Sequence, residues 1–179
     1  MLKFFLIALA VIVIAFVVVV ALQPADFRVT RSATVSAAAP ALFAQVNDFH
    51  KWQAWSPWAK LDPAAKNSFE GPSAGTGAIF KWSGNNEVGA GIMTIIESRP
   101  SDLIKIKLDF TQPFEATNTT EFTFKPDGNQ TVITWSMSGT NNFIAKAFCL
   151  FNSMDKMVGG QFEKGLADMK SVVEAAPKQ

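Results

Sequence analysis

The chain has 179 residues, enough for one domain or for one domain with a membrane anchor. Its 16 Lys and Arg nearly balance its 15 Asp and Glu, so it lacks the positive excess of a nucleic-acid-binding protein. One cysteine excludes an internal disulfide framework and a cysteine-rich zinc site, and one histidine excludes a multi-histidine metal site. We therefore expect no nucleic-acid partner, no metal and no other cofactor.

The N-terminal segment predicts a membrane anchor. Residues 4–22 are all apolar, and a helix of this length spans the roughly 30 Å hydrocarbon core of a bilayer. A cleavable signal peptide is the alternative, but its apolar part usually has about 7–15 residues and ends at a small-x-small site. The sequence Leu22-Gln23-Pro24-Ala25 is a poor site of this kind. We expect residues 1–23 to be a transmembrane helix and residues 24–179 to be a separate domain.

The charges that flank the apolar run bear on its orientation. Lys3 favours a cytoplasmic N-terminus, although Arg28 and Arg31 follow the other end of the run. We favour the arrangement with the N-terminus inside. The protein would then be a single-pass protein, expected in a bacterial inner membrane with its domain outside the cytoplasm.

The first part of the domain predicts one strand and a helical insert. Residues 27–35 alternate between apolar and polar side chains, as a half-buried strand does. Pro40 suits the first turn of a helix. Trp52, Trp55 and Trp58 follow at spacings of three, consistent with a short helical turn that Pro57 interrupts. The glycine-rich residues 71–77 predict a loop.

The remainder predicts an antiparallel meander followed by a long helix. Strands are expected at 78–82, 91–97, 103–110, 116–125 and 131–138, because these segments alternate and are joined by short turns. Apolar residues recur every three or four positions from 150 to 173, which predicts one helix. Gly159 and Gly160 lie inside it and predict a bend or a close approach to another backbone.

Several segments, together with this order of elements, carry a family resemblance. They are Asp48-Phe49-His50-Lys51-Trp52-Gln53-Ala54-Trp55-Ser56-Pro57-Trp58, residues 75–78 leading to Trp82-Ser83-Gly84, Gly89 with Gly91, and residues 134–139 and 159–166. Residues 26–175 resemble the SRPBCC (START-like) superfamily, which includes polyketide cyclases and dehydrases and birch-pollen-allergen-like lipid carriers. The resemblance implies an α+β helix-grip fold, a curved antiparallel sheet of about seven strands wrapped on a long C-terminal helix. Members of this superfamily bind, carry or transform many different apolar molecules.

The resemblance also implies an interior cavity for a hydrophobic small molecule or lipid, although the same side chains would equally form a packed core. The candidate lining residues are Trp52, Trp55, Phe80, Trp82, Ile106, Leu108, Phe110, Asn118, Thr120, Phe122, Trp135, Met154 and Phe162. Asn118 and Thr120 fall on the same inward face as Phe122. They would bind each other, water, or the polar end of a ligand. The tryptophans of the insert would either fasten it to the sheet or contact the ligand.

Evidence for catalysis in the sequence is weak. The single histidine, His50, has one acidic residue nearby in the sequence, Asp48, and a lone Asp-x-His pattern is weak support for catalysis. The Gly-x-Ser-x-Gly motif of a serine nucleophile is absent. Cys149, between two apolar residues, suits packing better than nucleophilic attack. The first hypothesis is therefore a membrane-anchored binding domain. An enzyme of the cyclase or dehydrase type and a structural module of the cell envelope with a closed cavity are the alternatives.

Residues 142–151 carry more apolar surface than one core contact needs. They would cover the cavity entrance, lie on the lipid surface beside the anchor, or be buried under the tryptophan loop.

Overall fold

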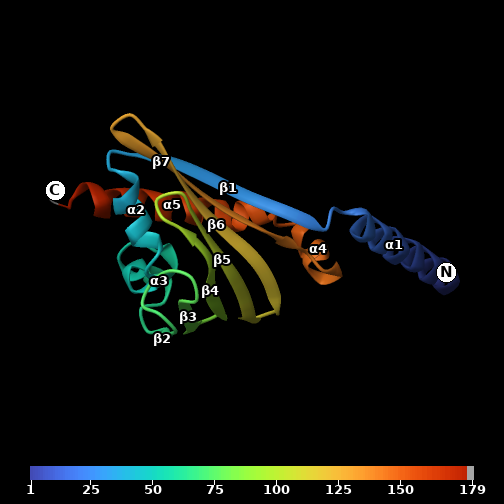
Figure 1. Cartoon of the computed structure of the whole chain (residues 1–179). Coiled ribbons are helices and arrows are strands. Elements are labelled where there is room, and N and C mark those ends of the chain that lie inside the picture. The colour runs from blue at the N-terminus through green and yellow to red at the C-terminus, as the bar shows by residue number, and fades with distance from the viewer. Residues whose placement is uncertain (177–179) are drawn as a thin grey trace.

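The computed structural model describes residues 1–176 and consists of one curved sheet that wraps a long helix (Figure 1). The helices are α1 (Leu2–Leu22), α2 (Ala39–Val46), the 3₁₀ helix η1 (Phe49–Ala54), α3 (Pro57–Leu61), α4 (Phe143–Cys149) and α5 (Met154–Glu174). The strands are β1 (Asp26–Val35), β2 (Lys66–Glu70), β3 (Ile79–Ser83), β4 (Ala90–Arg99), β5 (Leu103–Gln112), β6 (Ala116–Asp127) and β7 (Gln130–Thr140). The predicted helix-grip fold is confirmed.

The sheet is antiparallel throughout, with the strand order β1-β7-β6-β5-β4-β3-β2. Its register brings the start of β1 to the same end as the turn between β5 and β6 and the start of β4. The pairs at this end are Asp26–Thr140, Asn118–Gly139, Phe110–Ala116, Ala90–Gln112 and Ser83–Ala90. We call it the α1 end of the sheet, because α1 precedes β1 there, and Figure 1 shows α1 and α4 together at this end.

The core lies between the concave face of the sheet and α5. Phe162, Leu166 and Met169 of α5 are buried, and the ring of Trp135 stacks on that of Phe162 with centroids 4.2 Å apart. The inward residues expected from alternation are buried or half-buried, from Ile104 on β5 to Met137 on β7. The two-residue period of the strands therefore assigns the faces of the sheet correctly.

Helix α1 is long and apolar enough to cross a membrane, and no other helix among residues 1–176 meets this test. A signal sequence near an N-terminus meets it too. Apart from Val20, all of its residues are exposed. Such a surface is typical of helices that lie in an apolar environment.

The helix predicted over residues 150–173 corresponds to α5, which begins four residues later at Met154, and α4 precedes it as a separate helix. Each helix starts with its own side-chain cap. Asn142 accepts a hydrogen bond from the Ala145 N–H at 2.9 Å, and Ser153 accepts one from the Lys156 N–H at 3.3 Å. These caps satisfy backbone donors that a helix start leaves free, so α4 and α5 each begin at a residue of their own.

The two glycines do not interrupt α5, which continues through both. The close approach expected there is to a side chain and not to another backbone. A Cβ on Gly159 would lie 2.1 Å from Nη2 of Arg31, whose guanidinium pairs with Asp155 at 2.8 Å and with Glu163. Hydrogen bonds from Arg31 lower the pKa of Asp155. This cluster of charged residues joins β1 to α5, and the absence of a side chain at Gly159 leaves room for the Arg31 guanidinium.

In the first half of the domain, Trp52 lies in η1 and Trp58 in α3. The helical stretch is interrupted directly before Pro57, which occupies the first turn of α3, where its missing N–H costs nothing. Strand β2 was not predicted at all. Its five residues are all exposed at the edge of the sheet, so they carry no alternation of apolar and polar side chains.

Candidate ligand-binding cavity

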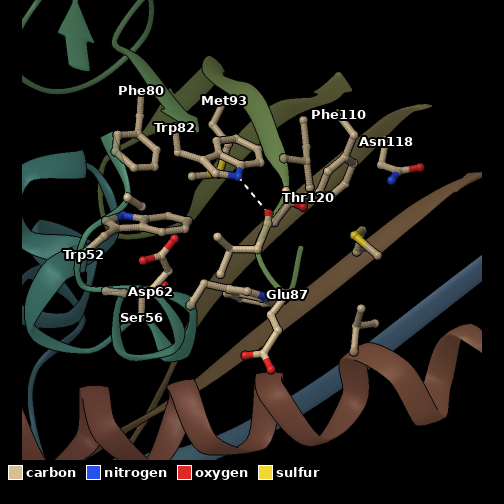
Figure 2. Close-up of a pocket in the computed structure, with 18 of the residues that line it drawn as sticks. Trp52, Ser56, Asp62, Phe80, Trp82, Glu87, Met93, Phe110, Asn118 and Thr120 are labelled. Carbon is tan, nitrogen blue, oxygen red and sulfur yellow. Dashed lines mark hydrogen bonds between the residues drawn. The ribbon is translucent and has the colours of Figure 1, made fainter. Parts of the chain in front are cut away.

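A cavity of about 430 Å³ lies between the concave face of the sheet, the helical insert and the first turns of α5 (Figure 2). This volume falls within the range of small-molecule sites, about 300–1,000 Å³. Of the residues predicted to line it, the structure places these on its wall: Trp52, Phe80, Trp82, Leu108, Phe110, Asn118, Thr120, Trp135, Met154 and Phe162. That they bind a ligand stays a prediction.

Three predicted lining residues, Trp55, Ile106 and Phe122, are absent from the cavity wall and completely buried in the core. The rings of Trp52 and Trp135 pack against both Trp55 and Phe122, with centroids 4.7–5.9 Å apart. Alternation along a strand shows which face a residue lies on. It does not show whether another side chain covers it, and this is why these three predictions are wrong.

The part of the cavity wall formed by β3 and the end of β5 is aromatic. The rings of Phe80 and Trp82 are nearly parallel, at 15° with centroids 6.0 Å apart, and Phe110 meets Trp82 edge to face at 5.8 Å. Figure 2 shows these rings and Trp52 around one side of the cavity. Gly91 makes this packing possible, since a Cβ there would lie 2.4 Å from Cη2 of Trp82.

The tryptophans also fasten the loops around the cavity. The indole N–H of Trp52 donates to the carbonyl oxygen of Val46 at 3.0 Å, within the insert. That of Trp82 donates to Val88 at 3.0 Å, which holds the β3–β4 turn against the sheet (Figure 2). With their N–H groups satisfied by backbone, both rings present apolar faces to the cavity. Trp52 therefore fastens the insert to the sheet, where its ring packs on Phe122 and Trp135, and it also lies on the cavity wall; contact with a ligand stays a prediction.

Two polar side chains of β6 lie on the inner wall, as predicted. Asn118 and Thr120 are 6% and 4% exposed. Neither side chain makes a hydrogen bond within residues 1–176. Both border the cavity, whereas the indole N–H of Trp135 is fully buried without a partner among these residues. Gly139, opposite Asn118 on β7, gives the amide its space, because a Cβ there would lie 2.0 Å from Oδ1.

Buried polar groups of this kind need a hydrogen-bond partner, and only water or a ligand in the cavity can reach these. An amide and a hydroxyl donate and accept hydrogen bonds without titrating near neutral pH. The pair therefore suits the orientation of a bound molecule better than acid–base catalysis.

Two acidic residues on the cavity wall were not predicted from the sequence. Asp62 and Glu87 line the cavity from the segment after α3 and from the β3–β4 turn, and both appear in Figure 2 below Trp82. The carboxylate of Asp62 accepts the backbone N–H groups of Ala64 at 3.1 Å and Asn85 at 2.7 Å. It thereby ties two loops together. An Asp whose carboxylate accepts the N–H two residues later is a recognisable turn signal, so the bond to Ala64 could be expected from the sequence. Nothing in the sequence of either loop predicts the bond from Asp62 to Asn85.

The weak catalytic candidates of the sequence are not brought together. His50 lies outside the cavity, with its Nδ1 2.9 Å from Oδ1 of Asp48 and its ring stacked on Phe69 at 4.0 Å. Cys149 is half-buried on α4, and its sulfur lies 3.9 Å from the side-chain nitrogen of Asn141. No shared site connects these groups.

The apolar segment at 142–151 is not buried under the tryptophan loop. Its large side chains are exposed: Phe143 by 47%, Ile144 by 66%, Phe148 by 53% and Phe151 by 76%. This excludes one of the three alternatives that the sequence left open.

Sequence comparison finds one family. The profile of the family described as "Polyketide cyclase / dehydrase and lipid transport" matches residues 26–174. None of the curated proteins matches the chain.

Solved structures share the fold at low sequence identity. The Aha1 dimer from Colwellia psychrerythraea has a TM-score of 0.61 at 12% identity, covering 85% of this chain and 99% of that one. Protein MLL2253 from Mesorhizobium loti has a TM-score of 0.60 at 16% identity, covering 85% and 100%. The major latex-like protein 151 from Panax ginseng has a TM-score of 0.57 at 11% identity, covering 82% and 97%. At such identities the likeness concerns the fold alone.

Proposed function

The chain belongs to the polyketide cyclase/dehydrase and lipid-transport family, and on this basis we propose that it binds one hydrophobic small molecule or lipid in its interior cavity while α1 anchors it in a membrane. The observation that carries the proposal is the combination of an apolar, aromatic cavity with two buried polar side chains, Asn118 and Thr120, that have no hydrogen-bond partner within residues 1–176.

The two kinds of wall have different energetic roles. Burial of apolar ligand surface contributes about 25 cal/mol per Å², before the costs of association are subtracted. Each hydrogen bond to Asn118 or Thr120 adds about 0.5–1.5 kcal/mol, because it replaces one to water. Affinity would therefore come from the apolar body of the ligand, and its orientation from the polar end.

The proposal is tested by titrating residues 24–179 with an anthroyl-labelled fatty acid. We expect saturable binding with one site per chain and quenching of tryptophan emission, since Trp52 and Trp82 line the cavity. Absence of saturable binding for fatty-acid and aromatic probes alike would contradict the proposal.

Replacement of Asn118 by leucine is expected to change selectivity more than affinity. Leucine has a similar size but cannot hydrogen-bond, so competition between fatty acids, fatty alcohols and their methyl esters should lose its dependence on the head group. The affinity for a purely apolar probe should stay within about threefold of that of the parent chain. Such a probe makes no hydrogen bond to Asn118, so it loses none of the roughly 0.5–1.5 kcal/mol that the bond contributes. Competition titrations measure both effects. Unchanged head-group preference would remove Asn118 from the site.

The anchor has its own test. The full chain is expected to fractionate with membranes and to resist extraction by alkaline carbonate, since α1 has 21 residues and an almost entirely exposed apolar surface. Residues 24–179 should appear in the soluble fraction. A mature chain that starts near Ala25 or Asp26 in N-terminal sequencing would show that α1 is a cleaved signal sequence instead.

A further inference from the structure

Helix α4 is held against the end of α1. The two helices are in contact, and Val20, two residues before the end of α1, is completely buried. The Nζ of Lys146 on α4 donates to the carbonyl oxygen of Ala21 at 3.0 Å. This satisfies one of the carbonyls that the end of a helix leaves free. In addition, the N–H of Asn141 donates to the carbonyl oxygen of Ala25 at 2.8 Å, so the connection between α1 and β1 is fixed.

Exposed apolar side chains gather around this junction. Phe143, Ile144, Phe148 and Phe151 come from α4 and the residues that follow it, and Phe114, 71% exposed, comes from the β5–β6 turn. Both elements lie at the α1 end of the sheet. We call these five residues the apolar rim. Large exposed apolar groups that gather at one end of a domain indicate contact with a partner or a membrane.

The apolar rim adjoins the cavity along the chain. Gln112 and Pro113 line the cavity directly before Phe114, and Met154 and Met157 line it shortly after Phe151. Asn118, which also lines the cavity, lies at the α1 end of β6. The rim and the cavity wall are therefore continuous at the α1 end.

We propose that the apolar rim inserts into the bilayer that holds α1, so that the cavity opens toward lipid and exchanges its apolar ligand with the membrane directly. This inference rests on the proposed function, both for the anchor and for the ligand.

The occupant of this surface is a lipid bilayer and not a protein because of the position of α1. At about 1.5 Å per residue, Val20 lies only about 3 Å inside the end of the apolar helix. A helix packed beside it is at the depth of the interface, where amphipathic helices bury their apolar face by about 5–10 Å. Lys146 reaches the end of α1 from this depth, as lysines do at membrane surfaces.

The first test measures depth in the full chain reconstituted in phosphatidylcholine vesicles. Spin labels are attached to Phe114→Cys and Phe151→Cys in a Cys149→Ser background, since Cys149 is the single cysteine. A label at Asn129→Cys, in the exposed turn between β6 and β7 at the opposite end of the sheet, is the control. We expect the labels at 114 and 151 to be accessible to oxygen and shielded from a water-soluble nickel complex, and the label at 129 to show the reverse. Equal nickel accessibility at all three positions would overturn the inference.

The second test measures the route of the ligand in the same vesicles. The anthroyl-labelled fatty acid is added to the bilayer, and its arrival in the cavity is followed by energy transfer from tryptophan. In the double variant Phe114→Asp and Phe151→Asp this rate should fall at least about tenfold, because a charge opposes insertion of the rim. Ile96→Asp, at a β4 residue that is 46% exposed outside the rim, should leave the rate unchanged. An unchanged rate in the double variant would also overturn the inference.

The two proposals fail in distinguishable ways. If residues 24–179 do not bind the probe in solution, the proposed function fails. If they bind it but the labels at 114 and 151 lie in water, only the route through the membrane fails.

Discussion

Truncation of Trp135 to alanine is expected to lower the free energy of unfolding by about 3–5 kcal/mol, the usual cost of removing a large buried aromatic side chain. Trp135 is 2% exposed and stacks between Phe162 at 4.2 Å and Phe122 at 4.8 Å. It therefore joins the sheet to α5. A loss of this size is a large part of the ~5–15 kcal/mol that stabilises a typical domain. A denaturant titration of residues 24–179 measures it.

Two controls separate the ring from its surroundings. Thr134→Ala, on the outer face of the same strand, removes only a partly exposed hydrogen bond to Ser32 and should cost about 1 kcal/mol or less. Trp135→Phe keeps a stacking ring and removes an indole N–H that has no acceptor within residues 1–176, so it should cost much less than the alanine variant. Equal losses for Trp135→Ala and Thr134→Ala would contradict the assigned faces of β7.

Filling the cavity is expected to abolish ligand binding. Leu108 on β5 and Val158 on α5 line it from the sheet and from the helix. One indole occupies only part of about 430 Å³, so Leu108→Trp should weaken binding of the anthroyl probe at least about tenfold, and the double variant with Val158→Trp should abolish it. Probe fluorescence is the readout, since the variants add tryptophan.

The matched control is Ile96→Trp, which adds the same indole outside the cavity at a residue that is 46% exposed. It should bind the probe like the parent chain. All three variants should remain folded by circular dichroism, because the rings added at 108 and 158 enter cavity space and the ring added at the exposed residue 96 lies at the surface. Probe binding by the folded double variant at parental affinity would place the ligand elsewhere.

The sequence predicted the fold well where one physical signal dominates. Strands β5, β6 and β7 have one buried and one open face, so their alternation shows both the strands and their inward residues. Strand β2 has no buried face and could not be recognised in this way. The start of α5 was predicted four residues too early, at Leu150, although Ser153 is a good capping residue, because the apolar spacing extends back beyond the cap.

The candidate site was predictable in part. The face of β6 that carries Asn118 and Thr120 follows from the position of Phe122 alone, and both residues line the cavity as expected. Whether an inward residue borders the cavity or lies behind its wall was not predictable. Phe122 points inward, but the rings of Trp52 from the insert and Trp135 from β7 cover it. Nor was the position of Asp62 and Glu87, because it depends on how two loops distant in sequence pack against each other.

The central claim is that an apolar molecule occupies the interior of this domain. A crystal structure of residues 24–179 with a fatty acid brominated near its methyl end tests it most directly. The account predicts the anomalous signal of bromine inside the cavity among residues such as Trp82, Leu108 and Met154, with the head group within hydrogen-bond distance of Asn118 or Thr120. Bromine found only on the outer surface, with the cavity side chains packed against one another, would contradict it.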